Sequence, residues 1–304
     1  MIKKLILNRK KMLESCTLCP HNCKVDRSKN KVGRCGCGAN VKIALASLHK
    51  FEEPCISGTN GSGTIFFSNC NLNCIFCQNY KVSHLGKGKN ISIKELADIF
   101  IEQQNQGAHN INLVTPTMYV VQIIEAIKIA RNNGLKIPIV YNTSAYENVE
   151  TIKMLKGYID IYLPDLKYYS NDLAKKYSRV DNYFENASKA ILEMYKQVGK
   201  PEFDENGLIQ KGLIIRHLIL PNYTLNTKHI LKWIKENLPQ DVYVSVMTQY
   251  FPSYKALQDN KINRKINYKE YKAIEEYIYE IGLKNGYMQD FVENENEEMY
   301  VPNF

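Results

Sequence analysis

Short apolar runs alternate with longer amphipathic segments from about residue 63 to the end of the chain. The apolar runs are rich in β-branched and aromatic residues and lie between polar or glycine-containing segments, which is typical of buried strands. They are TIFFS (64–68), HNINLV (109–114), IPIVY (137–141), YIDIYL (158–163), LIIRHLIL (213–220) and VYVSVM (242–247). This pattern predicts six strands.

Segments with apolar residues at helical spacing separate these runs. The first starts at Ser92, a typical N-cap residue, and stops at Gly107. The others cover residues 120–134, 147–155, 182–197, 228–237 and 268–283. Six strand-then-helix units with short connections predict a parallel sheet with right-handed crossovers. Because a complete barrel needs about eight units, the expected fold class is α/β, a partial, open (β/α)6 barrel of TIM type. The polar segment 200–211 is expected to be an exposed loop.

Length, composition and charge narrow the class of protein. With 304 residues, of which 44% are hydrophobic and 23% charged, the chain matches a globular protein of about two domains. We expect a small N-terminal cysteine-rich module, residues 1–60, followed by the barrel, residues 61–304. The net charge of +9 comes from lysines interleaved with acidic residues along the whole length. This distribution favours a solvated surface over a nucleic-acid-binding face.

The chain contains no apolar run of the ~18 residues that a membrane helix requires, and residues 1–12 lack the apolar core of a secretory signal. We therefore expect a cytoplasmic protein without a membrane partner. In that reducing compartment, closely spaced cysteines are expected to bind metal before they form disulfides.

Cys70, Cys74 and Cys77 form a C-x3-C-x2-C run directly after the first predicted strand. The same spacing would place three small core residues on one helical face, but the interleaved asparagines interrupt the apolar pattern. A zinc ion would need a fourth ligand from elsewhere. A four-iron, four-sulfur cluster takes four ligands, so three thiolates leave one iron open to a non-protein ligand. We therefore predict a 4Fe-4S site at these three cysteines.

Polar residues follow the predicted strands at the points where they end, and the carboxyl ends of parallel strands meet at one rim. They are Thr115, Thr117, Asn142, Thr143, Asp165, Lys167, Arg216, His217, Met247, Gln249 and Tyr250. Loops are polar in any protein, so each single residue also has a purely structural interpretation. Together, they predict a pocket beside the cysteine run.

With Phe76 before its last cysteine, the run resembles the C-x3-C-x-aromatic-C hallmark of the radical S-adenosylmethionine (SAM) superfamily. The stretches YNTSAYENVE, DIYLPDLKYY, IIRHLILPN and SVMTQYFP are similar to the branch related to pyruvate formate-lyase activating enzyme, and most similar to a group with an added amino-terminal cysteine module. The resemblance covers nearly the whole chain and implies the partial barrel of that family. It also implies that flavodoxin or ferredoxin reduces the cluster, that SAM is cleaved to a deoxyadenosyl radical, and that this radical takes a hydrogen atom. In this branch, the hydrogen comes from a glycine of a glycyl radical protein.

The resemblance further implies where SAM binds. Residues 114–117 occupy the place of the family's glycine-rich segment, which binds the methionyl amine, although the glycines and the acid of that segment are absent here. The predicted SAM-binding residues are Phe76, Thr115, Thr117, Asn142, Thr143, Asp165, Lys167, Arg216 and His217. No side chain is predicted to act as a catalytic acid or base.

The segment CTLCPHNCKVDRSKNKVGRCGCG contains a second set of cysteines: Cys16, Cys19, Cys23 and Cys35, with Cys37 as a fifth thiol. Four thiolates suit structural zinc or a second iron–sulfur cluster, and the C-x2-C start favours zinc. Without metal, five free thiols would lie in a lysine-rich stretch with little else to fold it. Cys55 is expected to be a single packed or surface thiol.

Three kinds of function remain open from the sequence. A radical enzyme that acts on a protein predicts a wide pocket rim. One that acts on a small molecule predicts a closed cavity, and one that acts on RNA predicts a basic groove. A non-catalytic iron–sulfur electron carrier or metal sensor would have no use for a pocket beside an open iron.

Overall fold

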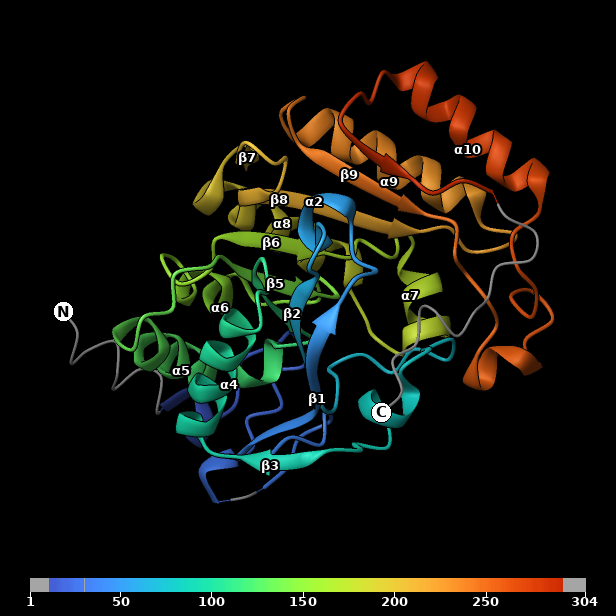
Figure 1. The fold of residues 1–304 in the computed structure, drawn as a ribbon. Coiled ribbons are helices and arrows are strands. Elements are labelled where there is room, and N and C mark those ends of the chain that lie inside the picture. Colours follow the sequence, from blue (N-terminus) through green and yellow to red (C-terminus); the bar gives the residue numbers. More distant parts are fainter. Residues whose placement is uncertain (1–10, 30, 292–304) are drawn as a thin grey trace.

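The structure is a computed structural model that describes residues 11–29 and 31–291. The prediction about a secretory signal falls largely on residues 1–10, outside the described residues. One curved sheet runs through the molecule, with the strand order β10-β9-β8-β6-β5-β4-β2-β1-β3 (Figure 1). Within the described part of the chain, no helix is both long and apolar enough to span a membrane.

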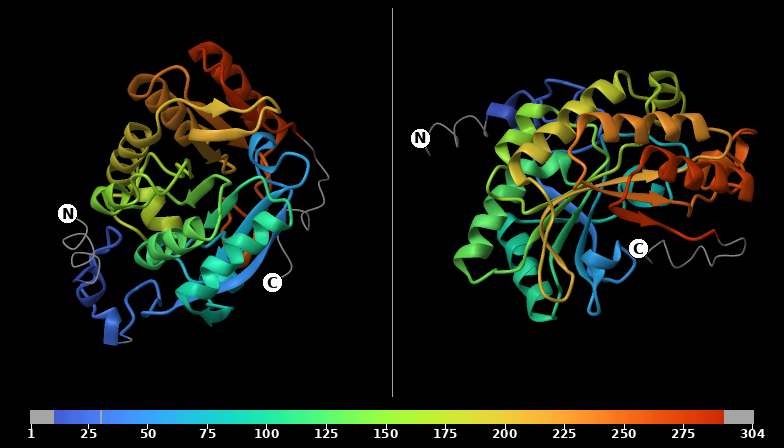
Figure 2. Two further views of the ribbon diagram at one scale, coloured as in Figure 1. Left: turned by 60° about the vertical axis from the view of Figure 1, so that its left-hand side comes forward. Right: turned by 90° about the horizontal axis from the view of Figure 1, so that it is seen from above.

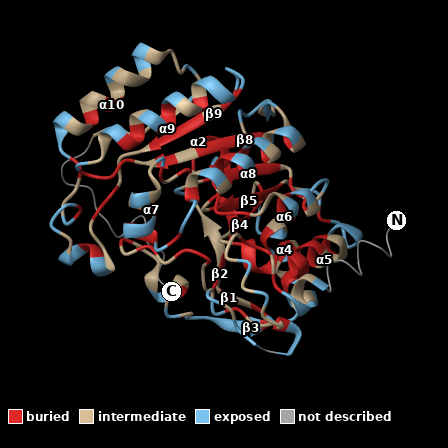
Figure 3. Cartoon of the chain, turned by 180° about the vertical axis from the view of Figure 1, so that it is seen from behind, coloured by how far each residue is buried: buried red, intermediate tan, exposed pale blue. Residues whose placement is uncertain are grey.

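Six neighbouring strands of this sheet are parallel and confirm the predicted set. They are β2 (Ser62–Phe67), β4 (Ile111–Val114), β5 (Ile139–Thr143), β6 (Ile161–Pro164), β8 (Ile209–Leu218) and β9 (Tyr243–Met247). Parallel strands are covered on both faces, which is why they read as nearly continuous apolar runs. Every residue of β2 is buried, and Figure 3 shows the central strands as the buried centre of the molecule. The sheet does not close, as expected for a partial barrel.

Helices cover the outer face of the sheet (Figure 2). The predicted ones are α4 (Ile93–Asn105), α5 (Val120–Asn132), α6 (Val149–Met154), α8 (Tyr183–Val198), α9 (Thr224–Asn237) and α10 (Tyr268–Ile281). Ser92 is the N-cap of α4, because its hydroxyl accepts from the backbone of Glu95 while the Glu95 side chain accepts from the backbone of Ser92. This reciprocal capping satisfies two backbone N–H groups that the first turn of the helix would otherwise leave without a partner. Three short elements, η1 (Arg27–Lys29), η2 (Thr117–Tyr119) and η3 (Tyr254–Gln258), are 3₁₀-helical.

Several elements were not predicted. They are the strands β1 (Val41–His49), β3 (Lys89–Ile91), β7 (Glu202–Phe203) and β10 (Gly286–Met288), and the helices α2 (Pro54–Ser57), α3 (Tyr80–Ser83) and α7 (Asn171–Ser178). β1 pairs antiparallel with β2, so residues 41–49 of the expected N-terminal module lie in the main sheet. The predicted loop 200–211 is wrong in part: β7 pairs with the start of β8, and Phe203 packs on Tyr243 with ring centroids 5.2 Å apart.

The short helix α2 lies against the inner face of the sheet. Cys55 and Ile56 are buried there with Val140, Ile161 and Ile214 in one apolar cluster. Cys55 is therefore a packed thiol, one of the two placements expected for it. Glu52 and Glu53, the two residues just before α2, lie near the carboxyl ends of the strands.

Candidate active site

A cavity of about 340 Å³ lies at the carboxyl ends of the parallel strands. One wall consists of residues at the ends of β4, β5, β6, β8 and β9, and the other of the cysteine loop, residues 70–79. The volume is in the range of ordinary small-molecule sites. The chain thus brings all three cysteines of the motif and the charged strand-end residues to one place, as the sequence pattern predicted.

The cysteine loop is held by α7, a helix that sequence analysis missed. The backbone N–H groups of Asn73 and Ile75 donate to the carbonyls of Ser178 and Tyr177, over 3.1 and 2.9 Å. Phe76 is buried and packs edge-on against Tyr250 at 6.0 Å between ring centroids. These contacts fix the loop without a regular helix, so the three thiols do not form the helical core face considered as an alternative.

Each sulfur of the loop has a hydrogen-bond donor within reach. The pairs are Cys74 Sγ with the Ser178 hydroxyl (2.9 Å), Cys77 Sγ with the Ser83 hydroxyl (3.1 Å) and Cys70 Sγ with the Leu72 backbone N–H (3.3 Å). Burial raises the pKa of Cys74 to about 11, and the charge of Lys167 acts in the opposite direction. Hydrogen bonds to thiolate sulfur stabilise the ligating form and tune an iron–sulfur cluster. The donor set therefore fits a cluster bound by three thiolates.

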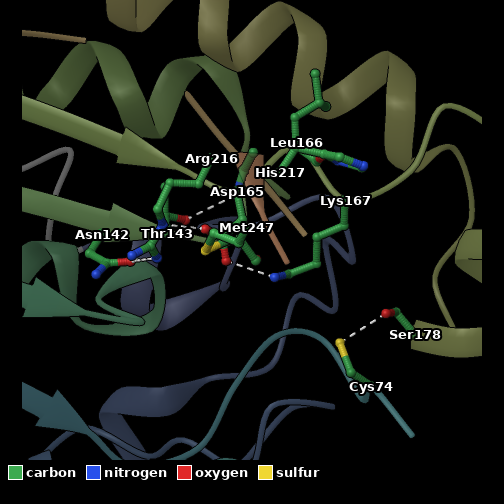
Figure 4. Close-up of polar contacts among 12 residues, drawn as sticks. Cys74, Asn142, Thr143, Asp165, Leu166, Lys167, Ser178, Arg216, His217 and Met247 are labelled. Carbon is green, nitrogen blue, oxygen red and sulfur yellow. Dashed lines mark hydrogen bonds and ion pairs between the residues drawn. The ribbon is translucent and has the colours of Figure 1, made fainter. Parts of the chain in front are cut away.

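Arg216 is the centre of the charged wall (Figure 4). Its Nε donates to Asp165 over 2.7 Å, its Nη1 to Glu52 over 2.9 Å, and its Nη2 to the side-chain oxygen of Asn142 over 2.6 Å. Lys167 lies 2.7 Å from the other Asp165 oxygen. Burial raises the pKa of Asp165, but Arg216 and Lys167 outweigh it and hold that pKa below its ordinary value. Because all these groups are largely buried, the network is rigid and costly to break.

Two carboxylates of the cavity come from a segment that sequence analysis did not assign to it. Glu52 binds Arg216 and also accepts from Asn112 over 2.9 Å. Glu53 is 7% exposed, and its Oε2 has no hydrogen-bond partner among the described residues. Burial raises the pKa of Glu53, while Arg216 lowers it. The only sequence signal was an acid pair directly before Pro54, and nothing in it indicated contact with a strand far along the chain.

Seven of the nine predicted SAM-binding residues line the cavity: Phe76, Thr115, Asn142, Thr143, Asp165, Lys167 and Arg216. His217 does not line the cavity, because it leaves β8 on the opposite side from Arg216, as side chains alternate along a strand (Figure 4). Its Nδ1 donates to the Leu166 carbonyl over 2.6 Å, and its Nε2 accepts from Thr227 over 2.9 Å. Burial lowers the pKa of His217 to about 4, so the ring is a neutral structural group.

Thr115 has a backbone φ of +61°, although it is a β-branched residue. That region favours glycine and costs other residues about 1–3 kcal/mol. Its backbone N–H donates to the Asn142 carbonyl over 2.9 Å, which holds the turn. The chain thus keeps, without glycine, a backbone conformation that glycine adopts readily, at the position where the resemblance predicted a glycine-rich segment.

Thr117, the other predicted residue that does not line the cavity, donates its hydroxyl to Glu147. Glu147 is buried, and its Oε1 accepts from the hydroxyls of Thr117, Thr143 and Tyr141 over 2.6, 2.6 and 3.2 Å. Its Oε2 has no partner among the described residues. Burial raises the pKa of Glu147 to about 7. This carboxyl group joins the ends of β4 and β5 just outside the cavity and was not found from the sequence.

The raised pKa of Glu147 predicts a pH-dependent stability. Between the ordinary pKa of 4.5 and about 7, the folded state keeps a proton that the unfolded state releases. This contribution to the free energy of unfolding is therefore complete below pH 4.5 and is lost as the pH rises to about 7. The full loss is about 3 kcal/mol, and Glu147→Gln should remove it. Urea unfolding of the wild type and of Glu147→Gln at pH 5 and pH 7.5 measures how the free energy of unfolding changes with pH. An equal change in both proteins would contradict the raised pKa of Glu147.

The N-terminal cysteines lie on a compact loop beside the barrel. Hydrogen bonds of 3.0 Å from Cys16 N to Val25 O and from Lys24 N to Cys16 O fold this segment back on itself. A Cβ on Gly33 would lie only 2.6 Å from Cys23 Sγ, so the segment that carries Cys35 passes directly against this loop. Over residues 11–29 and 31–291, no three Cys, His, Asp or Glu side chains converge on the position of a single metal ion.

The chain is similar to known proteins in sequence and, more distantly, in structure. A family model described as the radical SAM superfamily matches residues 64–209. An uncharacterized protein of Methanocaldococcus jannaschii is 34% identical over 280 residues, which are 88% of this chain and 75% of that protein. Streptococcus suis SuiB, solved with its precursor peptide SuiA, has a TM-score of 0.49 at 17% identity and covers 73% of this chain. Methylornithine synthase has a TM-score of 0.48 at 17% identity and covers 69%. The chain spans 47% and 59% of these two solved proteins, about half their length.

Proposed function

Because the chain belongs to the radical SAM superfamily, we propose that it is an enzyme that cleaves S-adenosylmethionine at a 4Fe-4S cluster bound by Cys70, Cys74 and Cys77. When bound, the cluster and SAM supply a radical that removes a hydrogen atom from a substrate. This proposal rests on one cavity in which three thiols face the charged ends of the parallel strands. A one-electron donor such as flavodoxin or ferredoxin is part of the proposal.

Different side chains of the cavity would bind the cluster and SAM. The thiols and their hydrogen-bond donors hold the cluster, while Leu72 and Phe76, both buried, limit the access of water to it. Among the described residues, the amine of Lys167 donates a hydrogen bond only to Asp165, and its charge lies close enough to Cys74 for the two to interact. It is placed to bind the carboxylate of the methionyl group. The carboxylates of Glu52, Glu53 and Asp165 outnumber the cations Lys167 and Arg216, which suits a sulfonium ligand with a net positive charge.

For the substrate, we propose a glycine-containing segment of a partner protein. Partly exposed lining residues with neutral amide side chains support this class: Gln78, Asn79, Gln249 and Gln289. Carboxamides pair with a polypeptide backbone through donors and acceptors of the same kind. Among the residues that the structure describes, the lining contains no lysine or arginine besides Lys167 and Arg216, so positive charge is not concentrated there as RNA would require.

A small-molecule substrate is the second candidate, and Glu53 favours it. Its buried Oε2, which has no hydrogen-bond partner within the described part of the chain, would bind a cationic group of a compact substrate. The modest cavity volume, much of which SAM itself would fill, fits a substrate that inserts only its reacting end.

Product analysis tests the proposal. The protein, loaded with iron and sulfide without oxygen and then reduced in the presence of SAM, is expected to form 5′-deoxyadenosine and methionine. A folded, cluster-containing protein that forms neither would support the electron-carrier alternative.

Cells of the source organism grown on deuterated glycine supply the second test. Deuterium transfer into deoxyadenosine from their protein fraction supports the protein substrate, and transfer only from the small-molecule fraction supports the second candidate.

A further inference from the structure

Arg27 is a buried cation that the active site does not explain. Its side chain is only 1% exposed. Its Nε and Nη2 donate to the Gly38 carbonyl over 3.0 and 2.8 Å, and its Nη1 to the Met118 carbonyl over 2.7 Å. None of the hydrogen bonds that Arg27 makes within the described residues goes to a carboxylate. A buried charge without a counter-charge costs several kcal/mol, so a negative group is expected beside it.

The nearest candidate for that negative charge is the N-terminal set of thiols. Nη1 of Arg27 lies 3.9 Å from Cys16 Sγ, and Cys16 and Cys19 are both buried. Cys23 and Cys35 are brought to the same loop by the close approach of Gly33. Cys37 is a fifth thiol beside Cys35, with its Sγ 3.7 Å from the Cys35 carbonyl, but it also contacts the Tyr119 hydroxyl of the main core over 3.4 Å. Four thiolates around a zinc ion, or around an oxidised 4Fe-4S cluster, carry a net charge of about −2.

We propose that Cys16, Cys19, Cys23 and Cys35 bind a negatively charged metal–thiolate centre and that Arg27 is its buried counter-cation. A zinc ion and an iron–sulfur cluster share this chemistry. In a cluster each thiolate binds a different iron, so the cysteines need not converge on one position, as they do not in the described residues. A zinc ion would require the loop to tighten around it.

The same module contacts the loop of the first cysteine set. The Asn69 side chain donates to the Cys35 carbonyl over 2.9 Å, and His21 Nε2 donates to the Asn71 carbonyl over 2.8 Å. These two asparagines flank Cys70. The centre therefore braces one end of the loop that holds the catalytic cluster, although its own ligands lie outside the cavity lining.

Metal analysis of a variant without the catalytic cluster tests the site separately from the proposed function. The triple variant Cys70→Ser, Cys74→Ser, Cys77→Ser, prepared without oxygen, should retain about one zinc, or about four iron and four sulfide, per chain. Adding Cys16→Ser and Cys19→Ser should remove that metal. Zinc gives no visible absorption, whereas a cluster gives a broad band that bleaches on reduction, which separates the two centres. A folded triple variant without stoichiometric metal would overturn the proposal, and failure of SAM cleavage alone would not.

The role of Arg27 is tested by a double-mutant cycle, which stays informative even where Arg27→Met weakens the fold. In the metal-loaded protein, Arg27→Met should lower the melting temperature and speed release of the metal to a chelator at least tenfold. In the Cys16→Ser, Cys19→Ser background, where Arg27 has lost its counter-charge, the same change should be neutral or stabilising. An equal change in melting temperature in both backgrounds would show that Arg27 stabilises the protein only through its hydrogen bonds to the Gly38 and Met118 carbonyls. Arg27→Lys, which keeps the charge, should retain the metal.

Discussion

Replacing Cys74 with alanine should abolish the formation of 5′-deoxyadenosine from SAM. Cys74 is the middle cysteine of the loop, and two thiolates do not hold a four-iron cluster in place. Loss of an outer-shell partner of a metal ligand typically costs 10–100-fold in affinity or activity. Loss of a ligand should therefore lower the rate by more than about 100-fold. Chromatography of the reduced reaction mixture, normalised to the protein concentration, measures the effect.

The control for this result is Cys55→Ser. Cys55 and Cys74 are similarly buried, at 4% and 8% exposure, but Cys55 lies in the apolar cluster between α2 and the inner face of the sheet. This variant should keep the iron content of the wild type and most of its rate. Wild-type product formation by Cys74→Ala would refute the cluster assignment. Equal loss in both variants would show that the assay reports general damage to the fold.

Replacing Arg216 with methionine should destabilise the protein by about 3–5 kcal/mol. The change leaves Glu52 and Asp165 without the cation that lies 2.9 and 2.7 Å from them, in a place where their side chains are only 9% and 17% exposed. The pKa of Asp165 should rise as well, because Arg216 is the strongest of the charges that lower it. For a chain of this length, the melting temperature should fall by roughly 10 °C. Differential scanning calorimetry of both proteins in the same metal state measures the difference.

Lys153→Met is the matched control for Arg216→Met. Lys153 forms an ion pair of 2.7 Å with Glu150, as short as the one between Arg216 and Asp165, but its side chain is 50% exposed. Solvent screens an exposed pair and leaves it with little effect on stability, so the melting temperature should change by only a few degrees. A similar fall in melting temperature in both variants would mean that burial does not determine how much the Arg216 network contributes to stability.

The fold was predictable where local pattern and burial agree. The six parallel strands read as apolar runs because helices and side chains cover both of their faces. Ser92 and Glu95 mark the start of α4 because a capping box is a contact between neighbours in the chain. The elements that were missed have weak local patterns. β7 is two exposed residues long, and α7 has a low content of apolar residues, so only their packing against β8 and the cysteine loop defines them.

The candidate site divides in the same way. By itself, the sequence determined the three-cysteine loop and most of the strand-end residues, because the loop is contiguous and because strand ends follow from the strands. It could not separate Arg216 from His217, since the side on which each residue leaves β8 depends on how the strand sits in the sheet. Only the tertiary structure decided that Glu52 meets Arg216, 164 positions further along the chain, and that Arg27 is buried against Met118, 91 positions away. Such contacts depend on how the strands pack, and no local pattern encodes that packing.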